Sequence, residues 1–338
     1  MRRSVSSTNT NPSIVETLII DAYEQFRDCH EGAVATYIPE LGKANPDHFG
    51  ICVMSVDGDY FEAGDCNVEF TIQSISKPFV YAMALTQHGR DKVYQRIGVE
   101  PSGDAFNSIV LDRETNRPFN AMVNAGAIAV ASLIQGETLS ERSAAQLAVF
   151  SAAAGRPLRV DDSVFRSESE TGHRNRAIAW LMRNFDMIDG NVDEILALYF
   201  QQCSILVTAR DLAVMGATLA NMGTNPLTGE NIFEMGCIQD VLSVMLTCGM
   251  YNYSGEWAFR VGVPAKSGVS GGILGVVNRQ LGIGAYSPKL DSRGNSVRGV
   301  KACIYLSEEL GLHAFNFMNH GSHFLKNMME RDVIQQTS

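Results

Sequence analysis

The chain has 338 residues, 45% of them hydrophobic and 19% charged, so it can bury a large core and does not have the composition of a disordered protein. Its formal net charge of −10 argues against nucleic acid or an anionic membrane as a main partner, because both bind basic surfaces. The seven cysteines form no Cys-x-x-Cys pair, so neither a disulfide framework nor a zinc site is indicated.

The N-terminal residues 1–12 are polar and contain no apolar segment of signal-peptide length. No later run approaches the length of a membrane span. We therefore expect a cytoplasmic protein with a disordered tail over 1–12 and no membrane partner. Apolar residues at helical spacing then predict a first helix over 14–27.

A β-hairpin is predicted next. Residues 49–56 and 60–61 read as strands, and Asp57-Gly58 between them is a strong signal for a tight turn. An apolar run of helical character follows over 74–85. It begins with Ser74-Ile75-Ser76-Lys77.

Ser74 and Lys77 suggest nucleophilic chemistry. A serine three residues before a lysine lies on the same helical face, where the lysine can remove the hydroxyl proton. Pro78 is tolerated only in the first turn of a helix, which places the pair at the helix start. Free backbone N–H groups there favour an oxyanion. In the alternative interpretation, Ser74 only caps the helix and Lys77 is a surface lysine.

Helical segments rich in Ala and Leu follow between about 120 and 250. They are 121–134, 140–154, 175–185, 192–200, 209–222 and 239–248. We expect an inserted helical subdomain over about 111–254. After it, 262–286 has the alternation of sheet strands, and 297–310 predicts a further strand and helix. The sheet subdomain would then comprise about 13–110 and 255–338, so that 13–338 form one catalytic domain.

Lys266-Ser267-Gly268 adds a second element to the serine motif. Ser-x-x-Lys followed by Lys-Thr-Gly occurs in serine β-lactamases and penicillin-binding proteins, and Ser267 keeps the hydroxyl of the threonine that it replaces. With strands at both ends of the chain and helices between them, this predicts an α/β fold of the α+β type, similar to these enzymes. It would have an antiparallel sheet flanked by helices and an inserted all-helical subdomain.

Several longer blocks occur in one order along most of the chain. They are Tyr37-Ile-Pro-Glu-Leu, Gln73-Ser-Ile-Ser-Lys-Pro, Met122-Val-Asn-Ala-Gly-Ala-Ile, Glu168-Ser-Glu-Thr-Gly-His-Arg-Asn175, Tyr199-Phe-Gln-Gln-Cys-Ser-Ile, Cys248-Gly-Met-Tyr251 and Pro264-Ala-Lys-Ser-Gly-Val-Ser-Gly-Gly272. The region that carries them resembles the serine-dependent glutaminases. The resemblance implies hydrolysis of L-glutamine to L-glutamate and ammonia by a homodimer or homotetramer, with neither a metal nor an organic cofactor.

The resemblance also implies catalytic roles. Ser74 would attack the side-chain amide carbon of glutamine and form a glutamyl ester. Lys77 would act as the base, if burial or the nearby cation Lys266 favours its neutral form. Tyr251 would pass a proton to the departing ammonia, with Tyr37 as a second hydroxyl at the site.

The substrate contacts follow from the same resemblance. The oxyanion would lie between the backbone N–H groups of Ser74 and Val269. The substrate-binding positions are Ser74, Asn124, Glu168, Asn175, Tyr199, Tyr251 and Val269. Glu168 suits the α-ammonium group, whereas asparagine and tyrosine suit the carboxylate and amide. Without the resemblance, Asn124 would cap a helix turn, Tyr199 would belong to the core, and Glu168 and Asn175 would lie in a solvated loop.

Two other functions remain open at this point. A β-lactam or peptidoglycan-type serine acyl hydrolase could use the same serine and lysine, although no clear Ser-Asp-Asn element is present. A non-catalytic glutamine-binding module would be expected to lack Ser74, Lys77 or Tyr251, and all three are present.

Overall fold

A computed structural model describes residues 13–316, which form a mixed α/β structure around an antiparallel sheet. Five strands lie in the order β3-β2-β8-β7-β6. Their bounds are β2 (Gly50–Ser55), β3 (Tyr60–Gly64), β6 (Ala265–Ser267), β7 (Gly272–Val277) and β8 (Leu281–Tyr286). Because β2 pairs directly with β8, the sheet joins segments from both ends of the chain, as predicted. The tail expected over 1–12 lies outside the described residues.

The predicted hairpin is confirmed. Met54 of β2 pairs with Tyr60 of β3, and the turn between them includes Gly58 at a φ of 92°. The Ser55 hydroxyl accepts hydrogen bonds from the backbone N–H groups of Asp57 and Asp59. These local contacts close the turn and set the register of the strands.

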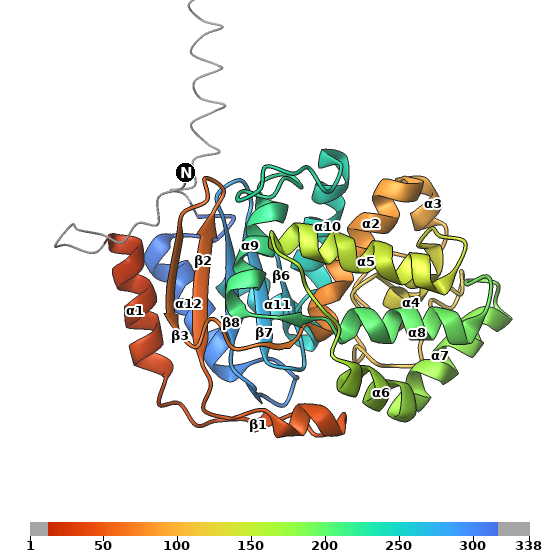
Figure 1. The fold of residues 1–338 in the computed structure, drawn as a ribbon, viewed down its shortest axis with the longest axis horizontal. Coiled ribbons are helices and arrows are strands. Elements are labelled where there is room, and N and C mark those ends of the chain that lie inside the picture. The colour runs from red at the N-terminus through yellow and green to blue at the C-terminus, as the bar shows by residue number, and fades with distance from the viewer. Residues whose placement is uncertain (1–12, 317–338) are drawn as a thin grey trace, which may run out of the picture.

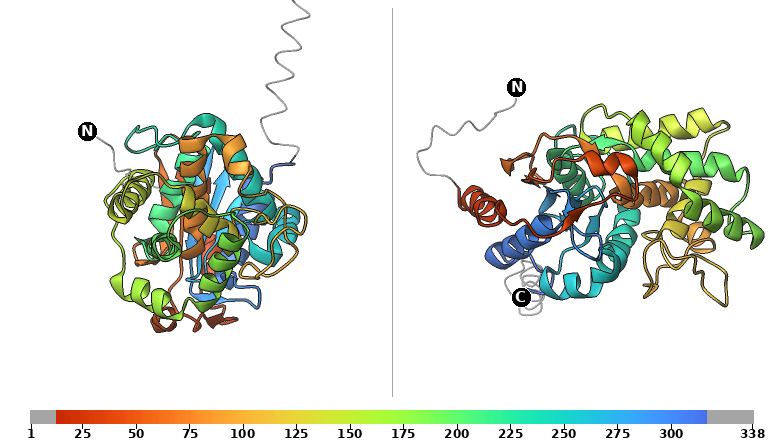
Figure 2. Two further views of the ribbon diagram at one scale, coloured as in Figure 1. Left: turned by 90° about the vertical axis from the view of Figure 1, so that its right-hand side faces the viewer. Right: turned by 90° about the horizontal axis from the view of Figure 1, so that it is seen from below.

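Helices cover both faces of the sheet. Helices α1 (Ile14–Phe26) and α12 (Val297–Leu310) pack against each other and against strands of the sheet (Figure 2). Helix α9 (Ala209–Ala220) packs against β2, β7 and β8. Its backbone approaches β8 so closely that a Cβ atom on Gly282 would lie 2.1 Å from the Ala217 nitrogen. The glycine is therefore required for this helix to contact the sheet.

The segment 297–310 differs from the prediction, because it forms one helix and contains no strand. The Ser296 hydroxyl accepts from the Gly299 N–H at the start of α12 and caps the helix there. The short strand β9 (Lys289–Leu290) precedes it and pairs with β1 (Ala33–Val34).

A block of helices lies at the end of the molecule opposite α1 (Figure 1). It contains α4 (Asn124–Leu133), α5 (Leu139–Ala154), α6 (Asp162–Thr171), α7 (His173–Asn184) and α8 (Val192–Cys203). Residues 13–316 also contain α3 (Arg90–Tyr94), α10 (Met235–Cys248) and α11 (Ser254–Arg260). Helix α6 has no apolar spacing that predicts it, and the Asp161 carboxylate caps it by accepting from Ser163 and Val164. None of the helices in residues 13–316 is long and apolar enough to cross a membrane.

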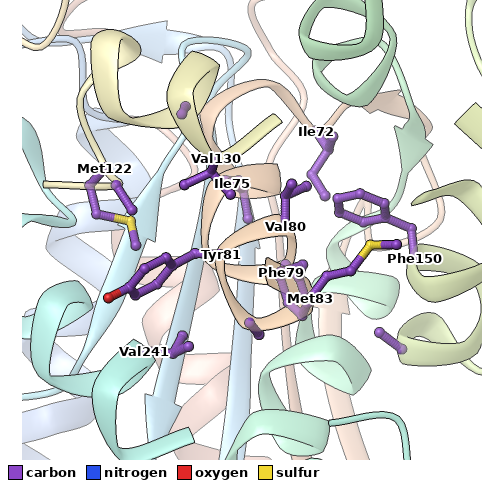
Figure 3. Packing of buried hydrophobic residues seen from close by; sticks show 14 of the residues in the cluster. Ile72, Ile75, Phe79, Val80, Tyr81, Met83, Met122, Val130, Phe150 and Val241 are labelled. Atoms are coloured by element: carbon purple, nitrogen blue, oxygen red, sulfur yellow. The ribbon is translucent and has the colours of Figure 1, made fainter. Parts of the chain in front are cut away.

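Helix α2 (Lys77–His88) runs through the hydrophobic core, and Figure 3 shows its side chains surrounded by other apolar residues. Phe79 packs beside Phe150 and Phe233, with ring centroids 5.8 and 6.3 Å away. The α-helix begins at Lys77, and residues Gln73–Ser76 form a 3-10 helical turn that runs directly into it. Ser74 and Lys77 therefore lie at the helix start, as predicted, although Ser74 itself is in the 3-10 turn. The core thus holds the start of α2 rigidly.

Candidate active site

Ser74 lines a cavity of about 120 Å³ between the 3-10 turn and the helical block. Other lining residues that the sequence predicted are Tyr37, Asn124, Glu168, Asn175, Tyr199 and Val269. The cavity therefore brings together five distant parts of the sequence around one buried serine. Ser74 itself is only 6% exposed.

Lys77 is fully buried beside this cavity and has no carboxylate hydrogen-bonded to it among the described residues. Its ammonium nitrogen donates to the Asn124 Oδ1 at 2.7 Å and to the Met122 carbonyl at 3.1 Å. Burial lowers the pKa of Lys77 to about 8. About a tenth of this lysine is therefore neutral at pH 7, far more than at its ordinary pKa, and the neutral form is the one that a general base needs.

The Tyr251 hydroxyl donates to the Ser267 carbonyl at 3.0 Å. The Ser74 side chain lies near the phenol oxygen and by itself would lower the pKa of Tyr251. Burial raises the pKa of Tyr251. The tyrosine therefore stays protonated, and it can release its proton only to a strongly basic group that forms beside it.

Lys266 lies behind Tyr251. Its nitrogen is 4.2 Å from the centre of the Tyr251 ring and donates to the carbonyls of Gly249 and Ser267. Burial and the neighbouring cation Lys77 lower the pKa of Lys266 well below its usual value. The lysine thus orients the tyrosine and the Ser267 carbonyl.

The opposite wall of the cavity carries the candidate substrate contacts. Glu168, on α6, is 6% exposed, and its Oε1 accepts a hydrogen bond from the Gln73 Nε2 at 2.9 Å. Burial raises the pKa of Glu168 to about 7. A buried carboxylate is stabilised by a cationic ligand group, because the charge of the ligand replaces the hydration that the carboxylate has lost.

Asn124 and Asn175 connect Lys77 to the wall of the cavity that carries the candidate substrate contacts. Asn124 begins α4 and its Nδ2 donates to the Asn175 Oδ1 at 3.0 Å. Asn175 lies on α7, so neither it nor Glu168 belongs to the solvated loop of the alternative interpretation. Tyr199 on α8 is 3% exposed, whereas Tyr37 is 58% exposed and stands at the cavity mouth.

The two backbone N–H groups expected to bind the oxyanion are available. Neither Ser74 nor Val269 donates its backbone N–H to another residue of the described chain. Ser74 and Val269 both line the cavity. Unpaired N–H groups at one small cavity can bind developing negative charge.

Sequence reasoning missed Gln73 and Phe106 as parts of the site. Gln73 has a φ of 51°, a conformation that is costly for a residue other than glycine, and it contacts Glu168 directly. Phe106 packs against the Tyr251 ring with centroids 4.4 Å apart. The segment around Phe106 has no regular pattern, so no sequence signal points to its role.

A second cavity, larger than the one around Ser74, lies in another part of the structure. A groove of about 550 Å³ lies between α2, α3 and α10, where Arg90 and Asp240 form an ion pair at 2.6 Å. None of the predicted site residues lines this groove. Nor do residues 13–316 contain a group of three His, Cys, Asp or Glu side chains that could hold a metal ion. Most of the predicted substrate-binding residues instead line the smaller cavity around Ser74.

Comparison with known proteins points to one family. The family model described as glutaminase matches residues 32–315. A glutaminase of Trichormus variabilis is 58% identical over 304 residues, which are 90% of this chain and 91% of the relative. A glutaminase of Nostoc sp. is 56% identical over 311 residues, 92% of this chain and 93% of the relative.

Solved structures agree with these relatives. The structure of Mglu in its glutamate form has a TM-score of 0.88 and 43% identity, covering 92% of this chain and 72% of the other. The Bacillus subtilis glutaminase YbgJ, in a covalent complex with 5-oxo-L-norleucine formed by reaction with 6-diazo-5-oxo-L-norleucine, has a TM-score of 0.82 and 39% identity. The matched region covers 89% of this chain and 99% of the YbgJ chain.

Proposed function

We propose that this chain, which belongs to the glutaminase family and is a glutaminase, hydrolyses L-glutamine through an ester on Ser74. The observation that carries this proposal is the position of Ser74, which lies buried in one cavity, near Tyr251 and three residues before the buried Lys77. The products are L-glutamate and ammonia.

In the first half-reaction, neutral Lys77 accepts the proton of the Ser74 hydroxyl while the serine oxygen bonds to the amide carbon of glutamine. The N–H groups of Ser74 and Val269 stabilise the resulting oxyanion. The carbon–nitrogen bond then breaks. Tyr251 protonates the departing ammonia and regains a proton from Lys77, so that both groups return to their starting states.

In the second half-reaction, water attacks the glutamyl ester. Lys77, neutral again, takes the proton of the water, and the Ser74 oxygen leaves with a proton supplied through Tyr251. The covalent complex of the YbgJ relative supports this route. Its adduct is a six-carbon α-amino acid with a ketone where glutamine has its amide carbonyl, as expected when a nucleophile attacks a glutamine analogue.

Substrate recognition would use the opposite wall of the cavity. Glu168 pairs with the α-ammonium group, and Asn124, Asn175 and Tyr199 provide polar contacts to the rest of the amino acid. Tyr37 contributes a hydroxyl at the mouth. Substrates that lack these two charges would leave buried polar groups unpaired, and this explains selectivity for a free amino acid.

We also propose that the fold is of the serine β-lactamase type, with a sheet subdomain and a helical subdomain of about 111–254. Support comes from the sheet built from both chain ends and from Lys266-Ser267 on β6, next to the start of α2. Helix α9, which packs on the sheet, would belong with the sheet subdomain despite its place in the sequence. Homodimers or homotetramers in the cytoplasm remain the expected state.

The first experiment compares the purified protein with its Ser74→Ala variant. We expect release of glutamate and ammonia from L-glutamine to fall to background in the variant, while the variant stays folded. L-asparagine and a chromogenic β-lactam are assayed in parallel. Turnover of the lactam without turnover of glutamine would favour the β-lactam hydrolase instead, and folded wild-type protein without any turnover would favour a binding module.

A further inference from the structure

Gln73 and Ser74 share a peptide bond whose orientation is important for the proposed reaction. The peptide bonds of the described chain are trans. In a trans peptide the C=O and N–H groups point in opposite directions. Any contact that fixes the Gln73 carbonyl therefore also fixes the direction of the Ser74 N–H, which is the proposed oxyanion donor.

Ser76 makes that contact. Its hydroxyl donates to the Gln73 carbonyl at 2.7 Å, and its side chain is completely buried. Gln73 holds a φ of 51°, which a non-glycine residue keeps only when its surroundings enforce it. The Gln73 side chain is tied as well, to Glu168 at 2.9 Å and to the Thr71 hydroxyl at 3.3 Å.

Two glutamines from the helical block direct the Ser76 hydroxyl. The Gln202 Nε2 on α8 donates to the Ser76 Oγ at 3.2 Å. The Gln146 Nε2 on α5 in turn donates to the Gln202 Oε1 at 3.3 Å. Both glutamines are buried, with 1% and 2% exposure. Because Gln202 uses its N–H to reach the serine oxygen, the serine proton is left for the Gln73 carbonyl.

We propose that Ser76, supported by Gln202 and Gln146, is a positioning residue that aims the Ser74 N–H at the oxyanion. The inference rests on the proposed function of Ser74. The three side chains do not line the cavity, and the Ser76 hydroxyl connects them to the peptide between Gln73 and Ser74. It also links α5 and α8 to the geometry of the 3-10 turn.

The test compares Ser76→Ala with a matched control, Ser307→Ala. Ser307 is 3% exposed and its hydroxyl donates to the Val261 carbonyl at 2.7 Å, the same contact as that of Ser76 but in a different part of the core. Ser307→Ala loses one buried hydrogen bond, whereas Ser76→Ala loses the same kind of bond and also the one from Gln202. Ser76→Ala should therefore lose at least as much thermal stability as the control, and the comparison of kcat separates this loss from the effect on the reaction.

We expect Ser76→Ala to lower kcat by about tenfold to a hundredfold, since removing an oxyanion donor altogether costs roughly a hundredfold to a thousandfold. The KM for L-glutamine and the calorimetric Kd for L-glutamate should stay within about twofold, because Glu168 and its neighbours are unchanged. Ser307→Ala should keep the wild-type kcat. A kcat of Ser76→Ala within about twofold of wild type, or an equal loss of kcat in both variants, would overturn the inference.

Gln202→Leu provides a second test, which also serves if Ser76→Ala does not fold. It leaves the Ser76 hydroxyl without a fixed donor, so we expect a smaller fall in kcat, about threefold to tenfold, at unchanged KM. In the double variant with Ser76→Ala, Gln202→Leu should lower kcat little further, because both changes act through the Ser76 contact to the Gln73 carbonyl. An unchanged kcat in Gln202→Leu, or full additivity of the two changes, would contradict the proposed chain.

Ser74→Ala, measured in parallel, separates this inference from the proposed function. If Ser74→Ala keeps its turnover, the ester mechanism fails, and the role of Ser76 fails with it. If Ser74→Ala is inactive while Ser76→Ala and Gln202→Leu both keep the wild-type kcat, only the positioning role is wrong.

Discussion

Asn124 connects Lys77, the proposed base, to Asn175 on the wall of the cavity that carries the proposed substrate contacts. Its Oδ1 accepts from the Lys77 ammonium nitrogen at 2.7 Å, while its Nδ2 donates to Asn175 at 3.0 Å. An uncharged amide supports the lysine without stabilising the charged form as a carboxylate would. This contact keeps the lysine in place and leaves burial to lower its pKa.

Asn124→Asp should therefore reduce activity at neutral pH. A carboxylate beside Lys77 favours the ammonium form, so the pKa of Lys77 rises and less of the base is neutral. We expect kcat/KM at pH 7 to fall by at least about tenfold and the acidic limb of its pH profile to move upward. Asn124→Ala is the control, since it loses the same contacts without adding a charge. An equal profile for the two variants would contradict the assignment of Lys77 as base.

The wild-type pH profile should reflect two buried groups. Lys77, with a pKa of about 8, must be neutral, and Glu168, with a pKa of about 7, must be ionised to pair with the substrate ammonium. Both conditions improve as pH rises, so kcat/KM should climb steeply from about pH 6 and level off above about pH 9. A profile that is flat between pH 6 and 9 would show that neither group controls the reaction.

Glu168→Gln should separate the two groups. The variant keeps the hydrogen-bonding shape but cannot offer a charge to the ammonium, so KM for L-glutamine should rise by about a hundredfold. In the variant, kcat/KM should still rise with pH near pH 8, where Lys77 titrates. It should no longer show the rise near pH 7 that comes from Glu168. Glu170→Gln, on the same helix and exposed, is the control and should leave both KM and the profile unchanged.

The burial of Lys77 should also be measurable as stability. Its pKa is lowered in the folded protein, so between about pH 8 and 10.5 the unfolded chain binds more protons than the folded one. Wild-type stability should therefore rise with pH across this window. A shift of this size corresponds to up to about 3 kcal/mol. Lys77→Met lacks that rise, so its advantage over wild type should shrink from pH 7 to pH 10.

Urea unfolding of both proteins at pH 7 and at pH 10 measures this difference. A stability difference between Lys77→Met and wild type that is the same at both pH values would mean that the lysine keeps its ordinary pKa in the folded protein.

Gly282→Ala tests the close contact between α9 and β8. The added methyl would lie 2.1 Å from the Ala217 nitrogen, which is backbone and cannot move aside, so we expect a loss of at least about 3 kcal/mol or failure to fold. Gly236→Ala in α10 is the matched control. A methyl there meets nothing within 4 Å, and the change should stabilise the helix by up to about 1 kcal/mol. Equal thermal midpoints for the two variants would contradict the packing.

Much of the fold can be predicted because its signals are local. Asp57-Gly58 predicts the hairpin from turn chemistry, and apolar spacing predicts most of the helices within a few residues of their ends. Helix α6 is missed because its polar face dominates its sequence. The strand expected in 297–310 is absent because the cap at Ser296 and the burial of α12 favour helix throughout.

The candidate site, like the fold, can be predicted from the sequence only in part. The residue types and their order, above all Ser74 with Lys77 and the longer blocks around Glu168 and Tyr251, already indicate the family and the kind of chemistry. They do not predict that Ser74 lies on a 3-10 turn, that Gln73 adopts a positive φ, or that Phe106 packs on Tyr251. Local sequence thus determined the elements and the reactive groups of this protein. Only the tertiary structure decided their pKa values, their orientation and the cavity they share, because burial and contact depend on segments that are far apart in the chain.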